Sequence, residues 1–163
     1  MSEHLISQQT ILLDFAADSK TDALYKICAH LFLMRKTQNP AGLYDDIIKR
    51  EAIVSTFAGQ HTAIPHVISS HVSEPVLCFV RLSNQDFVWN DNDEDVRIIF
   101  FLSVPEQKDL KQLRESQSHV FSSIAQLMQD THIMDLWLTT NDEQVILDSL
   151  KTAFQSNLNK KII

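Results

Sequence analysis

The hydrophobic pattern of the first third of the chain predicts two helices. Residues 19–36 carry apolar side chains at helical spacing, and Ser19 followed by Asp22 supplies an N-terminal capping signal. After the interruption at Asn39-Pro40, residues 42–54 predict a second helix with an apolar side. The apolar positions of the two helices are Leu24, Ile27, Cys28, Leu31 and Met34, then Leu43, Ile47 and Val54.

The period then changes to one typical of strands. Residues 10–15, 62–67, 75–83 and 96–104 are short runs of β-branched or aromatic apolar residues, and residues 86–89 form a shorter one. The run 96–104 is almost uniformly apolar, as expected of a strand covered on both faces. Helical spacing returns over residues 108–130, 132–138 and 142–154.

This order of elements predicts an α/β fold. Two helices, a block of strands and further helices indicate a mixed sheet of about five strands flanked by helices on both faces. The length of 163 residues suits one domain spanning residues 1–163, with residues 1–8 and 156–163 as flexible ends.

Composition excludes several classes of function. The net charge of −7, with no basic run, argues against binding to nucleic acid. Only Gly42 and Gly59 occur, too few for a nucleotide cradle built from backbone amides. No apolar run is long enough to span a membrane, and the N-terminus lacks a signal-peptide pattern, so we expect a cytoplasmic protein. Cys28 and Cys78 lie in apolar patterns and are expected to be buried, reduced thiols.

Three histidines recur at intervals of five: His61, His66 and His71. Five is an odd number, so a strand would place successive rings on opposite faces, and Pro65 disfavours a helix. No motif with metal-ligand spacing is visible, and we expect no metal. His61 and His71 have polar neighbours typical of loops. His66 differs because it follows the stiff, apolar Ala63-Ile64-Pro65, and a rigidly held imidazole is suited to act as a nucleophile.

The stretch REAIVSTFAGQHTAIPH, residues 50–66, resembles a known signature. It is similar to that of the fructose/mannitol type (type 2) of enzyme IIA in the bacterial phosphoenolpyruvate-dependent sugar phosphotransferase system, which includes a nitrogen-related paralogue. The likeness covers nearly the whole chain and is strongest over these residues.

The resemblance implies a phosphohistidine carrier without a cofactor. His66 would accept a phosphoryl group from the phosphocarrier HPr and pass it to a sugar-specific IIB component. Arg50 would bind phosphoryl oxygens through its planar fork of donors. Ser55, Thr56 and His61 are further candidates for phosphoryl binding, although the two hydroxyls could equally cap and turn the loop.

Two departures from the family pattern bear on this assignment. Glycine usually stands where this chain has His61 and Val67, and a second histidine is expected near the start of the long helix. An ungapped alignment places Gln117 there, while His119 would serve if the register shifts, and we expect His119 to approach His66. The alternatives are a regulatory protein of the nitrogen-related kind and a degenerate domain that is not phosphorylated.

Overall fold

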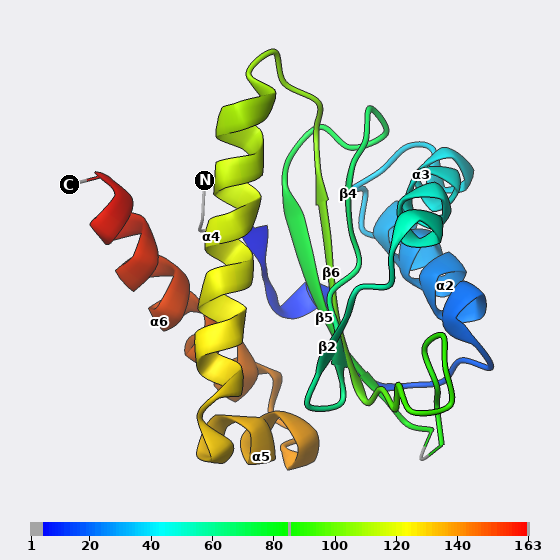
Figure 1. Ribbon diagram of the computed structural model, residues 1–163, viewed down its shortest axis with the longest axis vertical. Helices are drawn as coiled ribbons and strands as arrows, with labels where there is room; N and C mark the ends of the chain where they lie inside the picture. The colour runs from blue at the N-terminus through cyan, green and yellow to red at the C-terminus, as the bar shows by residue number, and fades with distance from the viewer. Residues whose placement is uncertain (1–4, 85, 163) are drawn as a thin grey trace.

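A mixed sheet lies between two layers of helices in the computed structural model, which describes residues 5–84 and 86–162, with side chains as far as residue 154 (Figure 1). The strand order is β1-β5-β6-β3-β2, and β4 also pairs with β6. The β5–β6 and β2–β3 pairs are antiparallel, whereas β1–β5, β3–β6 and β4–β6 are parallel. The strands are β1 (Ile11–Phe15), β2 (Phe57–Gly59), β3 (Thr62–Ala63), β4 (His66–Ile68), β5 (Val76–Leu82) and β6 (Ile98–Val104).

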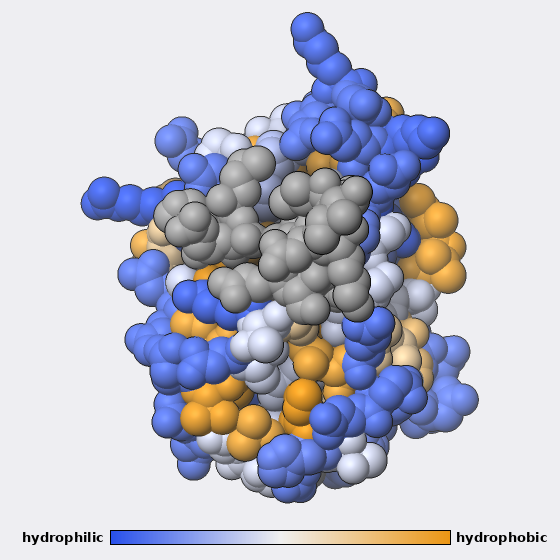
Figure 2. Space-filling view, turned by 90° about the vertical axis from the view of Figure 1, so that its left-hand side faces the viewer, coloured by the Kyte–Doolittle hydropathy of each residue, from blue (hydrophilic) through white to orange (hydrophobic). Residues whose placement is uncertain are grey.

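Helices cover both faces of this sheet, which confirms the predicted fold class (Figure 1). On one face lie α2 (Lys20–Leu33) and α3 (Pro40–Ile53). On the other lie α4 (Leu110–Met128), α5 (Thr131–Thr139) and α6 (Glu143–Ile162), together with the short η1 (Gln8–Thr10) that precedes β1. Figure 2 shows the side of this second layer, where hydrophilic residues surround smaller hydrophobic areas.

The two central strands form the middle of the core, because every residue of β5 and β6 is buried. Alternate side chains face opposite layers. Cys78 and Phe101 belong to the core on the α2–α3 side, whereas Phe79 and Phe100 belong to the core on the α4–α6 side. Burial on both faces explains why the sequence of these strands is almost continuously apolar.

Capping residues fix where the first two helices begin. The Ser19 side chain accepts a hydrogen bond from the backbone N–H of Asp22, as the sequence predicted. The second helix begins at Pro40, two residues earlier than expected, with the Asn39 side chain accepting from the N–H of Gly42. Proline suits the first helical position because its φ is already helical and its missing N–H would have no partner there.

Two strand predictions need correction. Residues 86–89 do not form a strand: Val88 makes only an isolated bridge with Asp95, and Phe87 and Trp89 are buried from a loop. The run 62–67 divides into β3 and β4, with Ile64 and Pro65 between them. Proline has no N–H for a strand ladder, which accounts for the break.

The chain ends were predicted to be flexible over residues 1–8 and 156–163. Residues 1–4 and 163, and the side chains beyond residue 154, lie outside the described residues. Within the described part, Leu5 and Ile6 are buried against the α4–α6 side of the core.

Both cysteines are free thiols buried in the core, as predicted. Burial raises the pKa of Cys28 to about 12 and raises that of Cys78 as well, so both remain protonated and unreactive at neutral pH. In the part of the chain that the structure describes, no helix is both long and apolar enough to cross a bilayer.

Candidate active site

His66 is the first residue of β4 and lies where three elements meet. β4 pairs in parallel with β6, placing His66 opposite Leu102, and it follows the stiff Ile64-Pro65 segment. The last turn of α3 contributes Arg50 to the site, and α4 contributes Phe121. The ring of His66 is therefore held at the margin of the sheet between the two helical layers.

The hydrogen bonds of His66 define its tautomer. Its Nδ1 lies 2.8 Å from the carbonyl oxygen of Ile64, which can only accept, so Nδ1 carries the proton. Its Nε2 lies 3.1 Å from Nη2 of Arg50, which can only donate, so Nε2 presents its lone pair. The Phe121 ring packs beside the imidazole, with the ring centroids 4.5 Å apart. This arrangement leaves Nε2 as the unprotonated ring nitrogen.

The surroundings of His66 also keep the ring neutral. Burial is the largest influence and lowers the pKa of His66. The carbonyl of Ile64 and the carboxylate of Glu51 raise this pKa, while the charge of Arg50 lowers it, and the net pKa is below the ordinary value of 6.5. A neutral imidazole with one unprotonated nitrogen is the form of histidine that can act as a nucleophile.

Glu51, next to Arg50, is a buried carboxylate with several donors around it. Only 4% of the residue is exposed. Its carboxylate accepts hydrogen bonds from Thr56 Oγ1, from Trp89 Nε1 at 3.3 Å and from Lys20 Nζ at 3.4 Å. The Lys20 ammonium also lies over the Trp89 ring, 5.5 Å from its centroid. This network ties the end of α3 to the start of α2 and to the loop before β6.

The two loop hydroxyls expected near the phosphoryl group are engaged elsewhere. Ser55 Oγ donates to Glu94 at 3.0 Å and accepts from the N–H of Phe57, so it turns the loop. The hydroxyl of Thr56 donates to Glu51, and its carbonyl accepts from the N–H of Ile64 at 2.9 Å. Both donors face carboxylates, and Thr56 braces the segment that precedes His66.

The structure does not bring His61 to His66. His61 lies in the turn between β2 and β3 with a φ of 60°, and its Nδ1 is 2.7 Å from the carboxylate of Asp95. Its carbonyl accepts from the N–H of Ile98, whereas His66 pairs with Leu102. Four residues along a strand correspond to about 13 Å. His61 is therefore a turn residue, and its expected contact with the phosphoryl group is corrected.

The second position with an unexpected residue, Val67, is a regular member of β4. It is buried against the α2–α3 side of the core and pairs with Ser103. The positive φ values of non-glycine residues in the described chain include that of His61 but not of Val67. Of these two positions, only His61 has the left-handed backbone conformation that glycine adopts most easily.

Gln117, not His119, lies on the side of α4 that faces the sheet. Gln117 is 8% exposed and precedes Phe121 by four residues, which places both side chains on one face. Its buried amide nitrogen has no hydrogen-bond partner. His119 lies roughly 200° around the helix from Phe121 and lines a surface hollow with Glu115, Ser118 and Ser122. The expected approach of His119 to His66 is corrected, and the ungapped register is favoured.

The three evenly spaced histidines thus occupy separate surroundings. His71 packs on the first turn of α3, where a side chain on Gly42 would collide with its ring. No group of three or more His, Cys, Asp or Glu side chains within the described residues is arranged to hold a metal ion. Of these three histidines, only His66 has its Nδ1 on a backbone carbonyl and an arginine at its Nε2.

Sequence reasoning missed Glu51 and Phe121 as parts of this site. The sequence around Glu51 gave no indication of its partners, because Lys20 and Trp89 are 31 and 38 residues away. The helical pattern of residues 108–130 does not single out Phe121, since the packing of its ring against an imidazole depends on how α4 crosses the sheet edge.

The chain matches a known family over most of its length. Residues 4–153 match the family model described as phosphoenolpyruvate-dependent sugar phosphotransferase system, EIIA 2. A multiphosphoryl transfer protein of Escherichia coli O157:H7 is 26% identical over 148 residues. That alignment covers 91% of this chain but only 17% of the relative.

Solved structures have the same fold. The nitrogen regulatory protein IIA-Ntr of Neisseria meningitidis superimposes with a TM-score of 0.75 at 23% identity, covering 91% of this chain and 97% of that one. Enzyme IIAMTL of Escherichia coli, in a complex with phosphorylated enzyme IIBMTL, gives a TM-score of 0.69 at 17% identity. The coverage is 89% of this chain and 96% of that one.

Proposed function

The chain belongs to the EIIA 2 family of the phosphoenolpyruvate-dependent sugar phosphotransferase system, and on that premise we propose that it carries a phosphoryl group on Nε2 of His66. The observation that carries this proposal is the tautomer of His66. Nδ1 is protonated against the Ile64 carbonyl, and the lone pair of Nε2 faces Arg50. Membership of the family gives phosphotransferase activity in general terms, and the proposal assigns it to this atom.

The transfer step forms one nitrogen–phosphorus bond and breaks another. Nε2 of His66 attacks the phosphorus of a phosphohistidine on the donor, and the donor imidazole leaves with the electron pair of its own nitrogen–phosphorus bond. The proton stays on Nδ1 and remains hydrogen-bonded to the Ile64 carbonyl, and this bond stabilises the positive charge that develops on the His66 ring. Onward transfer reverses these roles.

Arg50 stabilises the charge on the transferred group. Before transfer its Nη2 donates to Nε2. As the new bond forms, that lone pair is consumed, so the guanidinium moves its donors to the phosphoryl oxygens that now occupy the same place. Phosphoryl transfer depends mainly on such alignment and charge stabilisation.

Gln117 is the second donor in this proposal. Its unpaired amide nitrogen is buried on the face of α4 that carries Phe121, and Phe121 contacts His66. One neutral hydrogen bond from this amide to a phosphoryl oxygen would satisfy a donor that otherwise has no partner. Participation of Ser55 or Thr56 requires their hydroxyls to leave Glu94 and Glu51 first.

We infer that the donor is an HPr-like phosphocarrier, the acceptor is a IIB component and the setting is the cytoplasm. The relative solved with phosphorylated enzyme IIBMTL supports an acceptor of that class. A regulatory role, in which the same phosphohistidine is read by protein contacts, is the second candidate. It is supported by the likeness to IIA-Ntr over 91% of this chain and 97% of that protein.

The test is a complete relay. The chain is phosphorylated with phosphoenolpyruvate, enzyme I and HPr, separated from the donors and mixed with a panel of IIB domains. Rapid movement of the label to one IIB domain supports the carrier role in sugar uptake. A stable label that no IIB domain accepts supports the regulatory role, and a chain that takes up no label refutes both.

A further inference from the structure

Helix α3 and the segment from His66 to His71 lie side by side and run in opposite directions. Polar side chains connect them at successive levels: Arg50 with His66, Asp46 with Ser69, and Asn39 with His71. We call these contacts the α3–β4 seam. Asp46 is one helical turn before Arg50. A contact that holds Asp46 in place therefore also holds the turn of α3 from which the Arg50 side chain extends to His66.

Asp46 is the centre of the seam. Its Oδ2 accepts a hydrogen bond of 2.6 Å from Ser69 Oγ and lies 4.0 Å from Nε2 of His71. Ser69 is 1% exposed, and its Oγ also accepts from the N–H of His71 at 3.1 Å. One buried hydroxyl thus joins the helix carboxylate to the backbone of the segment that follows β4.

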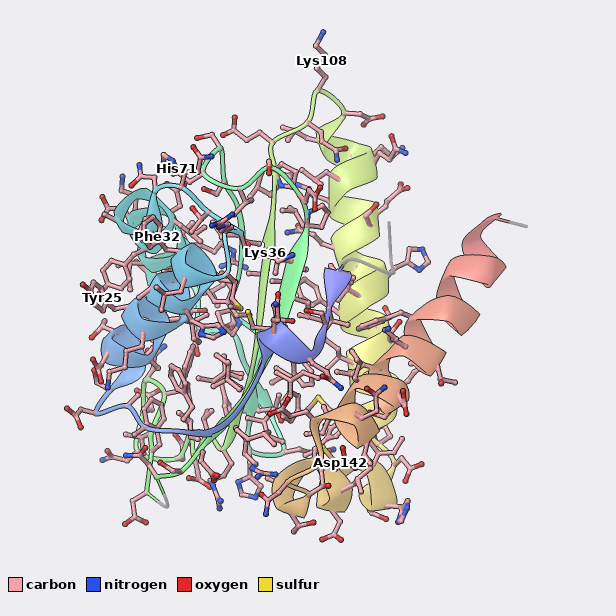
Figure 3. All side chains as sticks on the ribbon, turned by 180° about the vertical axis from the view of Figure 1, so that it is seen from behind. Tyr25, Phe32, Lys36, His71, Lys108 and Asp142 are labelled. Carbon is pink, nitrogen blue, oxygen red and sulfur yellow. The ribbon has the colours of Figure 1, made fainter. Side chains whose placement is uncertain are left out.

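The far end of the seam requires close approach of the two segments. The carbonyl of His71 accepts from Thr37 Oγ1 at 2.6 Å. A Cβ on Gly42 would lie 2.5 Å from Nε2 of His71, so only glycine allows the ring to rest on the first turn of α3 (Figure 3 shows His71 beside this helix). The backbone of Gly42 is helical, so no unusual conformation requires glycine there. What requires it is the close contact with the His71 ring, which a Cβ would occupy.

We propose that Asp46, Ser69 and His71 act as positioning residues, which hold α3 at the distance from β4 that keeps the Arg50 guanidinium on Nε2 of His66. The geometric part of this inference stands on the contacts alone, while its effect on phosphoryl transfer rests on the proposed function. Arg50 and His66 are joined by a single hydrogen bond at the end of the long arginine side chain, so their alignment depends on the elements that carry them.

The α3–β4 seam gives His71 a structural role. His71 belongs to no group that could hold a metal ion among the described residues, and it does not contact His66 in this seam. It is the outermost contact of the seam, and Asn39, which caps α3 through the N–H of Gly42, also lies 3.4 Å from Nδ1 of His71. The start of α3 is therefore fixed to the chain that continues from the phosphoacceptor strand.

The test reads the state of His66 directly and needs no transfer reaction. The side-chain nitrogens of His66 are titrated by NMR in the parent, in Ser69→Ala, in Arg50→Ala and in the double variant. The charge of Arg50 lowers the pKa of His66, so loss of the seam should raise this pKa toward that of Arg50→Ala. In the double variant, Ser69→Ala should then add nothing. Asp46→Asn gives a second measurement if Ser69→Ala does not fold.

Ser149→Ala is the matched control, because Ser149 is a partly buried hydroxyl that binds Trp137 and Ile146 on the other side of the sheet. It should lower stability without moving the pKa of His66. If Ser69→Ala and Asp46→Asn lower stability but leave the pKa of His66 unchanged, the seam is merely structural and the proposal is overturned.

A parallel measurement separates this inference from the proposed function. Transfer from phosphorylated HPr should slow by up to about 100-fold in Ser69→Ala, the loss that a misplacement of about 1 Å can cause. If the pKa of His66 shifts as expected but the parent itself takes up no phosphoryl group, the seam holds and the proposed function fails.

Discussion

Nη2 of Arg50 lies 3.1 Å from Nε2 of His66, although Arg50 belongs to helix α3 and His66 to strand β4. In the proposed function, this contact identifies the nitrogen that receives the phosphoryl group and the cation that then binds that group. Helix α3 supplies the cation, and strand β4 supplies the nitrogen. The chemistry therefore depends on how these two elements are held together.

Arg50→Lys should slow phosphoryl transfer to His66 by about 100-fold while preserving the fold, because losing one well-placed donor to a developing charge costs roughly 3 kcal/mol. Lysine keeps the charge but loses the planar fork. Single-turnover labelling from phosphorylated HPr measures the rate. A lysine variant as fast as the parent would show that Arg50 is only a local charge.

Gln117→Met should have opposite effects on stability and on transfer. Removing a buried amide nitrogen that has no partner should raise the free energy of unfolding by about 1 kcal/mol, and losing one donor to the phosphoryl group should slow transfer about 10-fold. Urea unfolding and single-turnover labelling measure the two quantities.

The control for this prediction is His119→Gln. His119 lines a surface hollow on another side of α4, so the substitution should change neither quantity appreciably. If His119→Gln slows transfer and Gln117→Met does not, the shifted register of the long helix is correct and the present assignment fails.

Glu51→Ala should lower the free energy of unfolding by about 3 kcal/mol, the lower end of the cost of removing one partner from a buried ion pair. It removes the carboxylate that accepts from Trp89 Nε1 and from the Thr56 hydroxyl, and it leaves Lys20 with Asn90 as its acceptor. Glu51→Gln retains an acceptor for Trp89 and should be less damaging. Urea unfolding of both variants tests this; a loss within measurement error for Glu51→Ala would show that the buried network contributes little.

The depressed pKa of His66 predicts a specific dependence of stability on pH. The folded ring binds a proton less readily than the unfolded one, so the unfolded chain holds more protons just below pH 6.5. The contribution of His66 is fully present above that value and is lost as the pH falls toward the lowered pKa. In urea unfolding between pH 8 and pH 5, the free energy of unfolding should therefore fall more steeply with decreasing pH in the parent than in His66→Gln. Equal slopes would contradict the depressed pKa.

The periodicity of the sequence was sufficient to predict the layers of the fold. The apolar spacing of α2 and α3 and the continuous apolar runs of β5 and β6 reflect one-sided and two-sided burial directly. Residues 86–89 misled the prediction because Phe87 and Trp89 are buried from a loop, and alternation alone does not distinguish a loop from a strand.

The site was harder to predict because its contacts join distant parts of the chain. Arg50 and His66 lie within one short signature, so their pairing could be expected from the sequence. The sequence could not decide which residues of α4 face His66, because this depends on where the helix begins after Val104. In the structure α4 begins at Leu110, with Asp109 as its capping residue. In the helix that begins there, Gln117 lies on the buried face.

The most direct test of this account is the intact mass of the parent and of His66→Ala after incubation with phosphoenolpyruvate, enzyme I and HPr. The parent should gain one phosphoryl group through an acid-labile, base-stable bond, and NMR of the ¹⁵N-labelled protein should show coupling between phosphorus and Nε2 of His66. His66→Ala should fold and gain nothing. A parent that gains no phosphoryl group, or a His66→Ala variant that still gains one, would contradict the assignment of His66 as the phosphoryl carrier.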